Sequence, residues 1–166
     1  FLDLWAVNYQ TGEPIPAEIV ERIIAAQNYL AAYLNVRQLS FGLTDMAWHT
    51  ITEPFEGDVE QFEVASMAPS QVQPVVPGTA RAPAFGHIFS GGYAAGYYGY
   101  KWAEVLEADA FSLFKEKGIF NREVSGSFRE NILSKGGTEH PMELYVRFRG
   151  HKPETKALIE KMGLGK

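Results

Sequence analysis

The residues best suited to chemistry lie between Phe85 and Trp102, where eighteen positions hold one histidine, five glycines and four tyrosines. Imidazole and phenol groups donate and accept hydrogen bonds, so they can bind a substrate or stabilise charge that develops on it. The loop Ser90-Gly91-Gly92 offers backbone N–H groups to a ligand if a helix follows it. This composition is typical of a polar wall beside a ligand and is poor material for an ordinary core.

The spacing of the tyrosines fits one face of a helix. Helical residues turn by about 100° each, so Tyr93, Tyr97 and Tyr100 share a face if a helix begins near Gly92. The opposite face carries apolar residues, namely Trp102, Leu106 and Leu113. Two interpretations stay open at this point. The phenols line a substrate cleft, or the helix packs in a core with glycines that allow close helix contact.

A proline-rich loop and a long helix must position this segment. Residues 69–86 contain four prolines and should form a loop, because prolines lack the N–H donor and the stretch has no helical or strand period. A loop of this length in a compact domain is more often functional than idle. Residues 87–117 should form a short loop and the central helix, which runs from about Gly92 to Lys117 and ends at a left-handed Gly118.

The rest of the chain predicts further helices and no sustained strand alternation. The expected helices cover residues 16–35, 37–49, 58–67, 127–134, 138–149 and 153–162. Their expected N-caps are Asp58 with Gln61 as its capping-box partner, then Ser125 or Ser127, then Thr138. The inward residues of the fifth helix should be Leu144, Tyr145 and Phe148. The predicted fold class is all-α, without a sizeable sheet, in one unit over residues 1–166.

Composition excludes several classes of protein. The chain has 166 residues, 46% of them hydrophobic, and a formal net charge of -5, so it lacks the basic surface typical of nucleic-acid binding. It has no cysteine and therefore no disulfide or thiol chemistry, and no apolar run reaches the roughly 18 residues of a membrane span. An apolar start without Met indicates a piece of a longer protein. The expected location is the cytoplasm, with the periplasm as the open alternative.

Several segments resemble the thimet oligopeptidase and peptidyl-dipeptidase family of zinc metallopeptidases. The strongest is His87-Ile-Phe-Ser-Gly-Gly-Tyr-Ala-Ala-Gly-Tyr-Tyr-Gly-Tyr100, which is similar to the family's substrate loop and following helix. Four further segments are also similar to the family, at residues 9–16, 110–121, 131–142 and 148–153. The resemblance therefore spans nearly the whole chain, and its motifs are long enough to be specific.

The resemblance implies a helical C-terminal segment of a zincin-type catalytic domain. Such a domain needs H-E-x-x-H on a helix, which places two imidazoles one turn apart beside a glutamate base. No two histidines here are four residues apart and none precedes a glutamate: His49, His87, His140 and His151. We therefore expect no metal ligand in this chain, a zinc-binding half upstream of Phe1, and no peptide cleavage by the isolated chain.

The resemblance also assigns roles to residues of the segment from Phe85 to Trp102. Tyr100 should donate to the oxyanion, with Tyr93 as its partner, and His87 should bind the substrate backbone or donate to the same oxygen. Ser90, Gly91 and Gly92 should form a flexible loop over the peptide, with Tyr97 as a weaker substrate contact. The motifs do not separate oligoendopeptidases from peptidyl-dipeptidases, and overall similarity slightly favours the dipeptide-releasing type.

The remaining polar and aromatic residues are expected to be structural. Tyr98, His49 and the tryptophans should pack, His140 and His151 should be solvated, and Glu104 could orient a phenol. Arg147 and Arg149 should form exposed ion pairs, although either could grip a substrate carboxylate. A rival interpretation is a non-catalytic helical module that binds peptides or proteins. In either case exposed apolar surface predicts homo-oligomers, with no nucleic-acid or membrane partner.

Overall fold

The computed structural model describes residues 2–165 and confirms the all-α prediction. Within these residues Val7 and Pro14 form one isolated bridge, and no strand occurs. The α-helices are α1 (Ala17–Ala26), α2 (Ala31–His49), α3 (Val59–Met67), α4 (Gly86–Phe89), α5 (Gly99–Lys117), α6 (Arg122–Phe128), α7 (Pro141–Arg149) and α8 (Lys156–Lys161). Short 3-10 turns at Leu2–Leu4, Ala68–Ser70 and Ala82–Ala84 and a π-helical turn at Arg129–Leu133 complete the helical elements.

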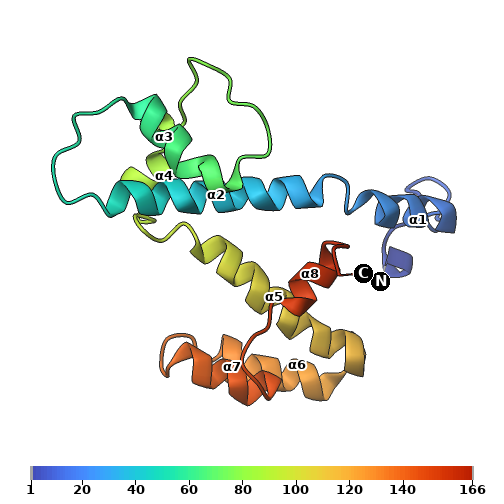
Figure 1. The fold of residues 1–166 in the computed structure, drawn as a ribbon. Helices are drawn as coiled ribbons and strands as arrows, with labels where there is room; N and C mark the ends of the chain where they lie inside the picture. Colours follow the sequence, from blue (N-terminus) through green and yellow to red (C-terminus); the bar gives the residue numbers. More distant parts are fainter. Residues whose placement is uncertain (1, 166) are drawn as a thin grey trace.

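The helices form two groups joined at the start of α5 (Figure 1). In the first group, α3 and α4 lie along the C-terminal half of the long α2, which also carries the proline-rich loop beside it. In the second group, α6, α7 and α8 pack around α5. The end of α8 reaches the junction of α1 and α2, since a Cβ on Gly163 would lie 2.7 Å from the Asn28 amide nitrogen.

The α1–α2 boundary differs from the predicted one. The break falls at residues 27–30, where Leu30 has φ 55°, and α2 then continues without interruption through the predicted gap near residue 36. Leucine rarely adopts a left-handed conformation, so the sequence offers no signal for this break.

The start of the central helix was also predicted wrongly. It begins at Gly99 instead of Gly92, because residues 93–98 form successive turns in which Ala95 has φ 53°. Its end at Gly118 is confirmed, although φ 108° and ψ 130° there are not the left-handed helical conformation that we expected.

Helix caps were predicted correctly in some places and wrongly in others. Asp58 caps α3 by accepting the Gln61 N–H at 2.9 Å, as expected. The helix predicted from Ser127 starts earlier, at Arg122, because the Asn121 side chain accepts the N–H groups of the second and third helical residues. His140 replaces Thr138 as the cap of α7, with its Nδ1 accepting the Met142 N–H. The last helix begins at Lys156, three residues later than predicted.

The second group has an apolar core with a buried polar network at its edge. Ala110, Val124, Tyr145 and Phe148 form the buried cluster. Asp109 is 4% exposed and accepts a 2.6 Å hydrogen bond from the Tyr145 hydroxyl. Burial, together with this bond and the nearby negative charge, raises the pKa of Tyr145. The phenol therefore stays protonated and donates to Asp109 at neutral pH.

Arg149 corrects one prediction and Arg147 confirms another. Arg147 makes an exposed pair with Glu139 at 2.7 Å, as expected. Arg149, expected on the surface, is largely buried, and its Nε lies 3.5 Å from an Asp109 carboxylate oxygen. The same Nε donates to the Asp109 carbonyl at 3.0 Å, and its Nη2 donates to Ser112. This arginine therefore ties α7 to α5 and is not available to grip a substrate.

The tryptophans only partly follow the prediction of a core position. Trp48 packs against Phe55 and Phe62 with ring centroids 4.9 and 4.3 Å away. Trp5 and Trp102 are exposed, as are apolar residues along α1 and α2, including Ile19, Ile23, Ile24, Leu34, Leu39, Leu43 and Met46. The prediction of a core position is therefore wrong for Trp5 and Trp102, which lie on apolar surface that the described residues leave uncovered.

The exposed surface is large for a protein of this size. It amounts to 11843 Å² at 18.5 kDa, whereas a compact monomer of that mass exposes about 8200 Å². The excess of about 3600 Å² is several times the roughly 800 Å² that each partner buries in a standard interface. Extensive surface of this chain is therefore suited to contact with other protein.

We expect the isolated chain to self-associate, because its apolar surface has nothing else to cover it. Multi-angle light scattering from about 5 to 200 μM protein should show a mass that rises above 18.5 kDa with concentration. A mass that stayed at the monomer value throughout would contradict this prediction.

Candidate functional site

The tyrosines gather, but not through a shared helix face. The rings of Tyr93 and Tyr100 stack with centroids 5.0 Å apart, and Tyr97 meets Tyr100 edge-on at 5.3 Å. Tyr100 lies in the first turn of α5, whereas the other two belong to residues 93–98, which we call the tyrosine turn. The sequence predicted that a helix would place the three tyrosines on one face. Instead, the bends of the tyrosine turn bring their rings together.

His87 joins this cluster from α4. Its ring stacks on Tyr93 with centroids 5.2 Å apart, and its Nε2 lies 3.1 Å from the Tyr100 hydroxyl in a hydrogen bond. The adjacent Tyr93 hydroxyl, desolvation and the neighbouring phenol Tyr97 raise the pKa of Tyr100 above its ordinary value. Tyr100 is therefore a neutral phenol at physiological pH and keeps a proton that it can donate.

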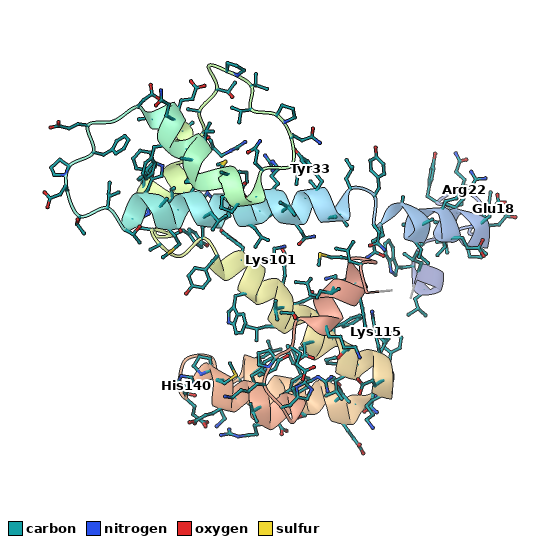
Figure 2. The ribbon with its side chains drawn as sticks, viewed as in Figure 1. Glu18, Arg22, Tyr33, Lys101, Lys115 and His140 are labelled. Carbon is teal, nitrogen blue, oxygen red and sulfur yellow. The ribbon has the colours of Figure 1, made fainter. Side chains whose placement is uncertain are left out.

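The phenols are open to the outside of the chain. Tyr93 is 38% exposed and Tyr100 is 41% exposed, which favours the substrate-cleft interpretation over an aromatic helix packed in a core. A hollow of about 470 Å³ lies between α2 and α5, lined by Tyr97, Tyr98, Tyr100, Lys101 and Glu104 with residues of α2. Its volume falls within the roughly 300–1,000 Å³ of small-molecule sites. Lys101 lies in this region between the two helices (Figure 2).

The hydroxyl of Tyr97 has a structural partner. It donates to the Gln38 amide oxygen at 3.0 Å, and its ring contacts Phe41 and Phe85. Glu104, which could have oriented a phenol, instead pairs with Lys101 at 2.5 Å. Among the three tyrosines of the cluster, these contacts leave Tyr93 and Tyr100 as the phenols most open to a ligand.

The glycines of the loop are required by the backbone. A Cβ on Gly91 would lie 2.9 Å from the His87 carbonyl oxygen, and Gly92 has φ 80°, a conformation that side chains disfavour. Ser90 uses both its N–H and its hydroxyl to bond the Gly86 carbonyl. Within the described contacts the N–H groups of Gly91 and Gly92 have no acceptor, so these two, rather than Ser90, can offer backbone donors to a ligand.

Two buried carboxylates that sequence reasoning missed anchor the segment at both ends. Asp45 accepts the N–H groups of Ala95 and Tyr97, each at 2.9 Å. Glu63 accepts those of Arg81 and Ala82 at 2.5–2.9 Å. An acidic residue inside the apolar stretch of α2 was an available signal for Asp45, because carboxylates are rarely buried without specific partners.

The other histidines do not gather. His49 bonds the Asp45 carbonyl, His140 caps α7 and His151 bonds the Lys152 carbonyl. Among residues 2–165 no three His, Asp or Glu side chains come together in a way that could hold a metal ion. In the same residues no helix combines the length and the apolar character that crossing a bilayer demands.

Comparison with known proteins gives a consistent result along the whole chain. The model of Peptidase family M3 matches residues 2–164. Oligopeptidase A of Escherichia coli (strain K12) is 49% identical over 164 residues, which cover 95% of this chain and 23% of that protein. Probable cytosolic oligopeptidase A of Arabidopsis thaliana is 40% identical over 164 residues, covering 96% of this chain and 23% of that protein.

A relative whose name describes a different activity is also similar. Dipeptidyl carboxypeptidase of Escherichia coli (strain K12) is 36% identical over 162 residues, which cover 96% of this chain and 24% of that protein. The chain thus spans about a quarter of the length of the curated relatives that it matches.

Proposed function

Since the chain belongs to peptidase family M3, we propose that it forms the substrate-facing wall of a zinc-dependent peptidase that hydrolyses short peptides. The observation that carries this proposal is the exposed, protonated Tyr100 phenol, hydrogen-bonded to His87 and stacked on Tyr93. Tyr93 directly follows the positive-φ Gly92, and Tyr100 lines the hollow between α2 and α5, so these groups are placed to meet a bound peptide.

Peptide hydrolysis passes through a tetrahedral state in which negative charge grows on the former carbonyl oxygen. A neutral phenol O–H directed at that oxygen stabilises the transition state more than the ground state. Tyr100 fills this role, with Tyr93 fixing the position of its ring and His87 either donating to the same oxygen or binding the peptide backbone. The N–H groups of Gly91 and Gly92 add donors for the substrate backbone.

In this proposal the zinc ligands come from outside the described residues, among which no three His, Asp or Glu side chains gather in a metal-binding arrangement. In the whole enzyme the metal would supply Lewis-acid activation, and the side chains described here would hold and orient the peptide. We further propose a cytoplasmic location and no nucleic-acid partner. The activities for which the relatives are named, oligopeptidase and dipeptidyl carboxypeptidase, support short peptides as substrates.

The proposal is tested by comparing the isolated chain with the full-length protein that contains it. We expect the chain alone to leave a fluorogenic peptide intact with or without added zinc. The full-length protein should cleave the peptide, lose activity to a chelator and regain it with zinc. Binding of peptides by the isolated chain, combined with a full-length protein that cleaves none, would instead support the non-catalytic binding module.

A further inference from the structure

The Asp45 carboxylate is buried near the C-terminal end of α2 and bound by groups from the tyrosine turn and from α2 itself. The side chain has no exposed surface. Its Oδ1 accepts the Ala95 N–H and its Oδ2 accepts the Tyr97 N–H, each at 2.9 Å. The Nδ1 of His49, one helical turn away, lies 2.9 Å from Oδ1. A charged group this deep is tolerated only with specific partners, and two of its partners belong to the tyrosine turn.

The turn that Asp45 holds has an unusual backbone. Ala95 has φ 53°, a conformation that residues with a Cβ seldom adopt and that persists where surrounding contacts impose it. Within the turn Gly96 donates to the Tyr93 carbonyl at 2.9 Å. The bonds from Asp45 tie this strained stretch to the rigid α2, so the conformation of the turn depends on a residue about fifty positions earlier.

The anchored atoms lie within three residues of the proposed catalytic phenols. Tyr93 precedes Ala95 by two positions, and Tyr100 follows Tyr97 by three. The stack of Tyr93 on Tyr100 and the bond from His87 to Tyr100 both cross the turn. A displacement of about 1 Å at a catalytic group can lower a rate by about 100-fold. A substitution of Asp45 that shifts the tyrosine turn should therefore lower the rate of peptide hydrolysis.

We propose that Asp45 is a positioning residue for peptide hydrolysis: it fixes the tyrosine turn and thereby aims Tyr100, without touching the substrate itself. This inference rests on the proposed function of Tyr100. It assigns a part in catalysis to a buried residue of α2. Sequence patterns alone do not indicate this role, because the residue lies far from the phenols along the chain.

The test is Asp45→Asn in the full-length, zinc-loaded enzyme. The amide keeps the shape of the side chain but has one acceptor oxygen in place of two, so one backbone bond is lost. We expect kcat to fall by about 10- to 100-fold while KM changes by less than about threefold. If this variant does not fold, Asp45→Ser, which also offers a single acceptor oxygen, is measured in its place with the same expected outcome.

Asp109→Asn is the matched control. Asp109 is an equally buried aspartate, nine residues beyond Tyr100 on α5, with partners in the second group of helices. Its replacement should lower thermal stability and leave kcat within about twofold of the wild-type value. An equal loss of kcat in both variants would mean that general destabilisation explains the effect, and would overturn the proposal.

A double-variant cycle with Tyr100→Phe gives the decisive readout. If Asp45 acts through Tyr100, adding Asp45→Asn to Tyr100→Phe lowers kcat by less than about threefold further. Full multiplication of the two effects, or an unchanged kcat in Asp45→Asn alone, would overturn the positioning role while leaving the proposed function in place. An unchanged kcat in Tyr100→Phe alone would reject the proposed function, and this inference with it.

Discussion

Replacing Tyr100 by Phe in the full-length, zinc-loaded enzyme should lower kcat by about 100- to 1000-fold with little change in KM. The substitution removes only the hydroxyl, which is exposed, protonated and bonded to His87. Loss of a single oxyanion donor typically costs this factor, and a donor that acts mainly in the transition state affects kcat more than substrate binding. Steady-state kinetics on a fluorogenic peptide measures both constants.

Tyr98→Phe is the matched control for this prediction. Tyr98 is a neighbour in sequence, is 61% exposed and lies beside Gly42 of α2. Removal of its hydroxyl should leave kcat and KM within about twofold of the wild-type values. If Tyr98→Phe and Tyr100→Phe lowered kcat equally, the effect would not identify Tyr100 as the donor.

Replacing Asp109 by Ala should lower the free energy of unfolding of the isolated chain by about 3–5 kcal/mol. Two carboxylates lie 3.5 Å from the largely buried Arg149, and the variant removes the buried one and leaves the more exposed Glu116. It also leaves the Tyr145 hydroxyl without the carboxylate that it bonds. Removing one partner of a buried ion pair has this magnitude, and the exposed Glu116 compensates the remaining charge only in part. Urea unfolding at a concentration where the wild-type chain is monomeric measures the change.

Glu107→Ala provides the comparison for the Asp109 prediction. Glu107 lies two positions earlier on α5 and pairs with Lys161 at 2.6 Å, but both side chains are about half exposed. An exposed pair contributes no more than about 1 kcal/mol. Equal losses of stability in the two variants would contradict the importance that we assign to burial around Asp109.

The sequence predicted those parts of the fold that local signals determine. The cap of α3 at Asp58 and the inward face of α7 follow from short-range patterns, and both are present. The family resemblance, carried by the stretch from His87 to Tyr100, is confirmed by the match to Peptidase family M3.

Features that depend on distant contacts could not be predicted from these patterns. The sequence of residues 93–98 is compatible with helix, and the turn forms where Asp45 captures the N–H groups of Ala95 and Tyr97. The left-handed Leu30 likewise carries no local signal, so the break before α2 was missed. The sequence therefore predicted that Tyr93, Tyr97 and Tyr100 lie together, but not the geometry that brings them together, because the backbone of the turn is fixed from α2. Their roles in catalysis stay a prediction.

The most direct test of the central claim compares the affinities of full-length wild-type and Tyr100→Phe enzymes for two ligands. One is a phosphinic peptide, whose tetrahedral group mimics the transition state, and the other is a product peptide of the same length. If Tyr100 stabilises the oxyanion, its loss weakens the phosphinic peptide by about 100-fold and the product by less than about threefold. Equal weakening of both ligands, or no weakening of the phosphinic peptide, would contradict the role proposed for the phenols of this chain.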